Sequence, residues 1–304
     1  MCITTNNGPT EVRVNRPVSL CYFVSDLHGA AERYQKLFSA IRDEQPRAVF
    51  IGGDLLPPMM AALSSIDGIH RDFINDFLAD QLQRLRDDLG ESTPRCFIIL
   101  GNDDQRIEEA ALIDLNARGL CEYLHSRRTK LGEFGVYGYA CVPPSPFLMK
   151  DWERYDVSRH VDPGCVSPED GWRSVPVAAN EVRYGTIKED LELLAGKDPL
   201  EKSIWLFHAP PYQTALDRAA LDGKTIDYVP LDVHIGSIAI QRFIQAKQPL
   251  VTLHGHVHES TRLTGEWRQT IGRTHAFNAA HDGPELALIR FDPAAPESAT
   301  RSLL

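Results

Sequence analysis

The chain has 304 residues, of which 43% are hydrophobic and 24% are charged, so it can build a sizeable apolar core. Its formal net charge of −10 argues against an extended nucleic-acid-binding surface, because such a surface depends on Lys and Arg. Residues 1–17 are polar, and no apolar run reaches membrane-spanning length, so we expect neither a signal peptide nor a membrane span.

The cysteines are scattered along the chain and form no CxxC pair. This spacing argues against a disulfide scaffold and against a zinc site built from thiolates. Together with the polar amino terminus, it predicts a cytoplasmic protein with reduced cysteines.

Strand-like and helix-like segments alternate in the first third of the chain. Strands are predicted at 20–24, 48–54 and 95–104, and amphipathic helices at 29–46 and 71–90. This alternation indicates an α/β architecture in which helices pack on a sheet.

The second half of the chain continues the pattern after an irregular stretch. A strand is predicted at 133–144, and an insertion rich in Pro, Gly and charged residues follows at about 143–185. Helices are then predicted at 186–196, capped by Thr186, and at 237–247, capped by Ser237, with strands at 203–207, 249–258 and 285–292. No repeat or linker interrupts the chain, so we predict a single domain over 1–304.

Five predicted strands end in side chains that can bind metal. These side chains are Asp26 and His28, Asp54, Asn102 with Asp103 and Asp104, His208, and finally His254, His256 and His258. In open α/β sheets, the carboxyl ends of the strands are the places where sites gather. In an extended segment the side chains of residues i and i+2 point the same way, so Asp26 with His28, and His256 with His258, would each present two ligands to one side.

Each of these endings alone has an ordinary explanation. A Gly-Gly-Asp sequence after a strand is usually a turn, and a single histidine such as His208 usually lies in the core or at the surface. Together the five endings supply carboxylate, imidazole and amide donors, which suit Mn, Fe, Zn, Co or Ni. We therefore predict a metal site.

The ordered series DLH, GGD, GND, FHAPP and GHVH, from Asp26 to His258, resembles the signature of the calcineurin-like metallophosphoesterases. The resemblance implies a four-layer α/β/β/α sandwich of two mixed β-sheets flanked by helices. It also implies two divalent metal ions at the strand ends and a small phosphorylated substrate.

Matched by position, the resemblance implies a ligand for the metals in each block of the signature. One ion would bind Asp26, His28 and His258, the second would bind Asn102, His208 and His256, and Asp54 would bridge both ions together with a hydroxide. The implied reaction is hydrolysis of a phosphate ester by in-line attack of that hydroxide, with Asp54, Asn102 and Asp103 in the catalytic positions.

Two departures from the family pattern narrow the expected activity. Asp103 stands where many members carry a histidine that assists the leaving group, and a carboxylate near two cations is a poor proton donor. The missing histidine favours a phosphodiesterase over a phosphomonoesterase. His254, Tyr212 or His281 are alternative proton donors for the leaving group. Asp104 is expected to orient its neighbours. The segment GGDLLPPM lacks the arginine of the Ser/Thr protein phosphatases, which disfavours that activity.

The segment PFLMKDWERYDVSRH has two interpretations. It forms a wall of the substrate site, with Lys150 and Arg154 near phosphate and Trp152 or Tyr155 stacking on a base, or it is a solvated loop whose Trp152 covers the core. Tyr212 and His254 are further candidates for substrate contact.

Two other functions compete with the phosphodiesterase. One is a catalytically weak or inactive metal-binding scaffold of the same fold, which the complete ligand set disfavours. The other is an amide-cleaving metallohydrolase, which the ordered GND and GHVH blocks disfavour.

Overall fold

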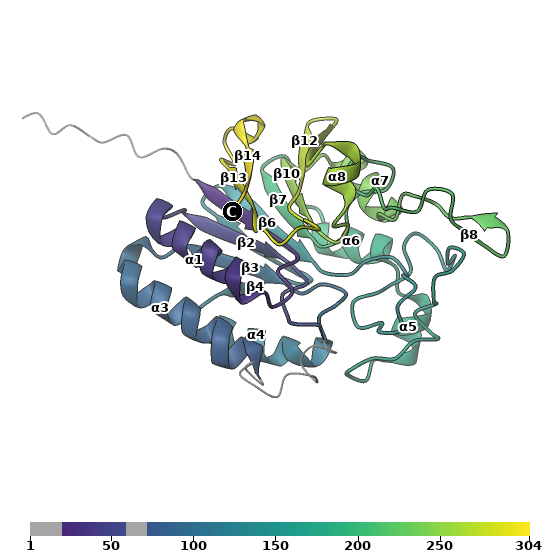
Figure 1. Cartoon of the computed structure of the whole chain (residues 1–304), viewed down its shortest axis with the longest axis horizontal. Coiled ribbons are helices and arrows are strands. Elements are labelled where there is room, and N and C mark those ends of the chain that lie inside the picture. Colours follow the sequence, from purple (N-terminus) through teal and green to yellow (C-terminus); the bar gives the residue numbers. More distant parts are fainter. Residues whose placement is uncertain (1–19, 59–71) are drawn as a thin grey trace, which may run out of the picture.

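Two six-stranded mixed β-sheets pack face to face and carry helices on their outer sides (Figure 1). The structure is a computed structural model, and it describes residues 20–58 and 72–304. The four-layer sandwich predicted from the sequence is confirmed.

The first sheet has the strand order β14-β13-β1-β2-β3-β4. Its strands are β1 (Cys21–Val24), β2 (Ala48–Gly52), β3 (Arg95–Ile99), β4 (Glu122–Tyr123), β13 (Ala287–Phe291) and β14 (Thr300–Leu303). Strands β1 to β4 run parallel, with Val24 opposite Ile51 and Gly52 opposite Ile99, whereas β13 is antiparallel to β1. The carboxyl ends of β1 to β4 therefore meet at one edge.

The second sheet has the order β11-β12-β10-β7-β6-β5. Its strands are β5 (Arg127–Leu131), β6 (Phe134–Tyr139), β7 (Ser203–Phe207), β10 (Val251–His254), β11 (Arg268–Ile271) and β12 (Thr274–Asn278). The four inner strands are parallel, and β5 and β11 are antiparallel edges. A separate hairpin joins β8 (Thr225–Ile226) and β9 (Val229–Pro230).

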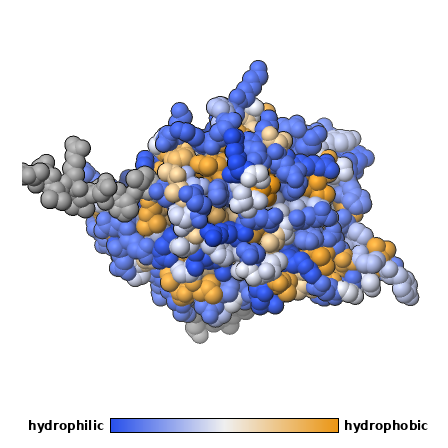
Figure 2. All heavy atoms as spheres, turned by 90° about the horizontal axis from the view of Figure 1, so that it is seen from above, coloured by the Kyte–Doolittle hydropathy of each residue, from blue (hydrophilic) through white to orange (hydrophobic). Residues whose placement is uncertain are grey.

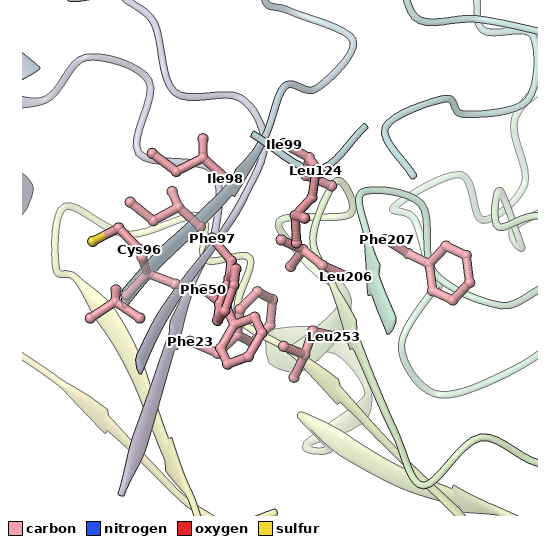
Figure 3. Packing of buried hydrophobic residues seen from close by; sticks show 14 of the residues in the cluster. Phe23, Phe50, Cys96, Phe97, Ile98, Ile99, Leu124, Leu206, Phe207 and Leu253 are labelled. Carbon is pink, nitrogen blue, oxygen red and sulfur yellow. The ribbon is translucent and has the colours of Figure 1, made fainter. Parts of the chain in front are cut away.

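The core lies between the two sheets, where alternate residues of each strand point inward. Phe23, Phe50 and Phe97 of the first sheet face Leu206 and Leu253 of the second (Figure 3). All five are fully buried. Such burial stabilises the fold by about 1.5–3 kcal/mol per side chain.

The outer layers are helical. The helices are α1 (Ala31–Glu44), α3 (Ala79–Leu89), α4 (Glu109–Ala117), α5 (Ala179–Tyr184), α6 (Ile187–Ala195), α7 (Ile238–Lys247) and α8 (Ser260–Thr264). Figure 1 shows α1, α3 and α4 along the first sheet, and α6 and α7 on the side of the second. Phe207 points away from the inner core and packs against Phe243 of α7, with 6.3 Å between ring centroids.

The start of one helix and the ends of two strands differ from the prediction. The helix predicted at 71–90 begins with a π-helical turn over Phe73–Leu78, and its residue 71 lies outside the described residues. The strand predicted at 95–104 ends at Ile99, and the strand predicted at 249–258 ends at His254. Beyond these residues the chain leaves the sheet and forms the loops that carry Asn102 and His256.

The segment predicted as an irregular insertion contains isolated bridges, such as those pairing Val142 with Glu153 and Met149 with Trp172, and the short helix α5. Among the helices that the structure describes, none is long and apolar enough to cross a bilayer. Figure 2 shows a face made largely of hydrophilic residues, with apolar residues in small groups.

Candidate metal centre

Six of the seven predicted ligands fall into two groups that share one carboxylate. Asp26, His28, Asp54 and His258 form the first group, and Asp54, His208 and His256 form the second, with the ligand atoms of each group within 4.8 Å of one another. The seventh, Asn102, places its Oδ1 atom 3.1 Å from Nε2 of His208. The structure therefore brings all seven side chains to one place.

Both sheets supply these side chains from the carboxyl ends of their parallel strands. Strands β1, β2 and β3 lead into Asp26, Asp54 and Asn102, whereas β7 and β10 lead into His208 and His256. The loops are tied together, because Gly255 N–H donates to the His208 carbonyl at 2.9 Å and His256 N–H donates to Asp26 Oδ1 at 3.1 Å.

Four of the ligands have left-handed backbone conformations, which non-glycine residues rarely adopt. The φ angles of Asp26, His28, Asp54 and His256 are 58°, 47°, 51° and 72°. The Asp26–His28 segment is therefore not extended. The expectation that Asp26 and His28 project to one side because they belong to an extended strand is wrong. Backbone hydrogen bonds from Asp26 N–H to Gly53 O and from His28 N–H to Asp54 O, at 3.0 and 2.8 Å, hold these conformations instead.

Two glycines leave room for the ligands. A Cβ atom on Gly101 would lie 2.3 Å from Oδ1 of Asp54, and one on Gly255 would lie 2.5 Å from Oδ2 of Asp26. No real carbon approaches an oxygen so closely, so any side chain at either position would displace a ligand.

The first group is held by contacts among its own members. His258 Nε2 lies 3.0 Å from Asp26 Oδ1 and 3.2 Å from His28 Nε2. Burial disfavours a charged His258, but the Asp26 and Asp54 carboxylates outweigh burial and raise the pKa of His258 to about 9. Burial likewise disfavours ionised Asp26, and the neighbouring histidines reverse the effect and lower its pKa.

In the second group, a backbone contact fixes the orientation of the histidine ring. His208 Nδ1 donates to the Gly52 carbonyl at 2.8 Å, so Nε2 faces Asp54 Oδ2 at 3.2 Å. Burial disfavours a charged ring, yet Asp54 and Asp26 raise the pKa of His208 to about 10. His256 differs, because burial and the nearby His208 lower its pKa to about 4.

The spacing of these donors fits divalent cations. Two ligands bound at about 2.1 Å with angles of roughly 90–110° lie about 3.0–3.4 Å apart. The pairs His258–Asp26, His258–His28, His208–Asp54 and His208–Asn102 are separated by 3.0, 3.2, 3.2 and 3.1 Å. The two imidazole nitrogens His258 Nε2 and His28 Nε2 thus lie as close together as two ligands of one ion would.

Asp103 and Asp104 play different parts beside these ligands. Asp103 has a side chain that is 46% exposed, with Oδ2 3.9 Å from His28 Nδ1, and its N–H donates to Asp54 Oδ1 at 2.8 Å. Asp104 is fully buried and accepts hydrogen bonds from Leu55 N–H and Gly101 N–H at 3.0 and 2.9 Å. Asp104 thus joins the loop that carries Asp54 to the loop that carries Asn102, which agrees with a residue that orients its neighbours.

Of the predicted substrate contacts, Lys150 and Arg154 are neutralised by protein carboxylates. Lys150 is fully buried and lies 2.5 Å from Glu153, and Arg154 pairs with Glu181 and Asp190, each at 2.9 Å. These pairings and the complete burial of Trp152 agree with the second interpretation, in which Trp152 covers the core, but the fully buried Lys150 is not part of a solvated loop. Contact of Lys150 and Arg154 with substrate stays a prediction.

The candidate proton donors each contact other groups of the protein. His254 is buried, with Nδ1 and Nε2 each 2.9 Å from the Ala209 carbonyl and Thr252 Oγ1. Tyr212 donates to Asp232 at 2.5 Å, which, with burial, raises the pKa of Tyr212 to about 12. His281 lies 3.0 Å from Glu285. Their roles toward substrate stay predictions.

One residue at the site was not predicted. Arg33 of α1 donates from Nη1 to the Asp26 carbonyl at 2.7 Å and from Nη2 to the Gly283 carbonyl. It thereby links the first ligand-bearing loop to a loop near the end of the chain. The sequence carried one signal for it, since a helix that starts directly after DLHG must place its first turn against that loop.

A family model for calcineurin-like phosphoesterases matches residues 21–260, while no curated protein matches the chain. Among solved structures, the protein TT1561 of Thermus thermophilus is 16% identical with a TM-score of 0.55, covering 94% of this chain and 99% of that one. Phosphopantetheinyl hydrolase (PptH) of Mycobacterium tuberculosis is 12% identical with a TM-score of 0.51, covering 88% and 90%. At such identities the likeness to solved structures concerns the fold alone. The family model, however, spans all five ligand-bearing loops, and this chain belongs to the calcineurin-like phosphoesterase family.

Proposed function

We propose that this protein hydrolyses small phosphate esters, diesters in preference to monoesters, with two divalent cations at the metal centre. The observation that carries the proposal is the membership of Asp54 in both ligand groups, because one shared carboxylate would hold two cations close together. When bound, such a pair lowers the pKa of water and neutralises the charge of a phosphate.

The chain's own residues prepare this site for an in-line displacement. Gly52 O fixes the ring of His208, and Asp103 N–H fixes Asp54, so that neither ligand reorients as substrate enters. Asn102 Nδ2 donates to Asp103 Oδ1 at 3.1 Å, which leaves Asn102 Oδ1 facing His208.

Asp103 supports the preference for diesters. Its partly exposed carboxylate would repel a monoester dianion more strongly than a diester monoanion. Burial and Asp54 raise the pKa of Asp103 in the metal-free protein, and bound cations would act in the opposite direction. An ionised Asp103 donates no proton, so esters with good leaving groups should react much faster than alkyl esters.

We also propose that the protein works in the cytoplasm. This is supported by the free thiols of Cys96, Cys121, Cys141 and Cys165, which suit a reducing compartment.

The first experiment removes metal with a chelator and adds back Mn²⁺, with bis-(p-nitrophenyl) phosphate as substrate. We expect Mn²⁺ to restore hydrolysis, and Asp54→Asn or His208→Ala to abolish it. Arg84→Gln is a matched control, since Arg84 lies exposed on α3 and pairs with Asp80, and it should keep wild-type activity. A purified protein that holds no metal, and is inactive with every divalent ion added, would instead support the scaffold alternative.

A further inference from the structure

A cavity of about 390 Å³ is lined by residues other than the metal ligands. Among its lining residues, His125 and Cys141 follow the carboxyl ends of β4 and β6. Strand β4 is the parallel neighbour of β3, and β6 is the parallel neighbour of β7. Because neighbouring strands are about 4.8 Å apart, the cavity sits one strand away from Asn102 and His208 on the same edge of both sheets.

The chain itself also connects the cavity to the metal centre. Arg106 lines the cavity and follows Asp103 by three residues. Its backbone N–H donates to Asp151 at 2.8 Å, and Asp151 lines the cavity as well.

The carboxylates that line the cavity are already occupied by donors of the protein. Asp151 also accepts from Ser174 N–H at 2.8 Å. Glu153 binds Lys150, and both Glu181 and Asp190 bind Arg154. Each of these carboxylates therefore has a donor of the protein as its partner.

Two guanidinium groups on the cavity wall have no carboxylate partner. Within residues 20–58 and 72–304, no carboxylate forms an ion pair with Arg127 or Arg173, and Arg173 donates to the Pro168 carbonyl at 2.8 Å. Arg106, in contrast, forms an ion pair with Glu109 at 3.4 Å. The wall therefore presents two guanidinium groups that no protein carboxylate of the described residues neutralises.

His125 lies on the same wall, with its ring 4.8 Å from that of Trp152 between ring centroids. Burial, followed by the charges of Arg106, Arg154 and Arg127, lowers the pKa of His125 to about 3. The ring is therefore neutral at pH 7.

We propose that this cavity binds a second anionic group of the substrate, a phosphate or a carboxylate, through Arg127 and Arg173, while the ester to be cleaved lies at the metal centre. This rests on the proposed function and narrows it to esters that carry a further negative charge. Guanidinium groups suit both oxyanions, because their planar array of N–H donors matches two oxygens at once.

The test uses three p-nitrophenyl butyl phosphodiesters whose butyl chains end in a phosphate, a carboxylate or a carboxamide. With Mn²⁺ bound, we expect kcat/KM for at least one anionic ester to exceed that of the carboxamide about tenfold or more, as charged hydrogen bonds allow. The better anionic ester identifies the group that the cavity takes. Equal values for all three esters would overturn the proposal.

Variants test whether the cavity causes the preference for anionic esters. In the Arg127→Gln/Arg173→Gln double variant, the ratio of kcat/KM between the anionic and the carboxamide esters should fall at least tenfold. In Arg84→Gln, which replaces an exposed residue of α3 that does not line the cavity, the ratio should stay as in the wild type. A ratio unchanged in the double variant would show that another surface selects the anion, and would overturn the proposal.

A binding measurement separates this inference from the proposed function. If neither the three esters nor bis-(p-nitrophenyl) phosphate is cleaved, the proposed function fails. Calorimetric titration of the metal-free protein with pyrophosphate then tests whether the cavity binds an anion. The inference then requires binding that weakens about tenfold in the double variant. Absence of binding, or equal binding by both proteins, would contradict it.

Discussion

Asp26 and Asp54 keep their negative charge inside the protein because histidines lie beside them. Both carboxylates are almost fully buried, and burial alone would raise their pKa values. The neighbouring His258 and His208 rings reverse this and lower both pKa values. The same histidines have raised pKa values, so in the metal-free site protons on the rings take the part that cations would take.

At the scale of one residue, His125 predicts a pH dependence of stability. Its folded pKa of about 3 lies below the ordinary value of 6.5, so the unfolded chain binds more protons between these values. The free energy of unfolding should therefore fall as the pH drops from about 6.5 toward 3, by up to about 1.4 kcal/mol per pH unit from this ring.

The variant His125→Asn tests this prediction. Asn keeps an acceptor for Ala140 N–H, which donates to His125 Nδ1 at 3.1 Å, but it does not titrate. Urea unfolding between pH 4 and 7 should give a shallower dependence on pH for the variant than for the wild type. Parallel curves for the two proteins would mean that His125 titrates normally in the folded state.

At the scale of elements, the starts of α6 and α7 are capped by hydroxyls that the sequence predicted. Thr186 Oγ1 accepts from Glu189 N–H at 3.2 Å, and Ser237 Oγ accepts from Ile240 N–H at 3.0 Å. Ser237 also donates to Asp156 Oδ1 at 2.5 Å, and Asp156 accepts from Ile238 N–H at 2.6 Å. A carboxylate from the irregular segment thus shares the cap of α7.

We expect Thr186→Ala to lower the free energy of unfolding by about 1 kcal/mol, and Ser237→Ala to lower it by about 2 kcal/mol. The larger effect is expected because Ser237→Ala also removes the hydrogen bond that Ser237 Oγ donates to the Asp156 carboxylate. Urea unfolding of both variants at pH 7 measures the difference. Equal losses would show that the bond to Asp156 adds no stability.

The sequence predicted the elements whose signals are local. The helix caps at Thr186 and Ser237 and the apolar runs of β1, β2, β3, β7 and β10 each lie within a few residues. The paired strands β11 and β12 and the edge strand β14 were not predicted, because their stability comes from pairing with neighbouring strands rather than from their own pattern. The partners of Arg154 were not predicted either, since Glu181 and Asp190 are distant in sequence.

At the scale of the whole molecule, the metal centre depends on the packing of two sheets. Asp26, His28, Asp54 and Asn102 follow strands of the first sheet, and the remaining ligands follow strands of the second. The sequence predicted this gathering because each ligand directly follows an apolar strand, and parallel strands share an edge. It did not predict the left-handed backbone of four ligands, because those conformations are held by hydrogen bonds between loops that are remote in sequence.

Cations bound between the two sheets should therefore stabilise the whole fold. Ligand at 1,000 times its Kd adds about 4 kcal/mol to the free energy of unfolding, so saturating Mn²⁺ should raise the Tm of the chelated protein by several degrees. Asp54→Asn weakens both ligand groups and should lose most of this rise, whereas Arg84→Gln should show all of it. Differential scanning calorimetry at pH 7.5 measures the shift without any substrate. An equal rise in Asp54→Asn and wild type would mean that Mn²⁺ binds elsewhere. It would contradict the inference that Asp54 is shared between two cations.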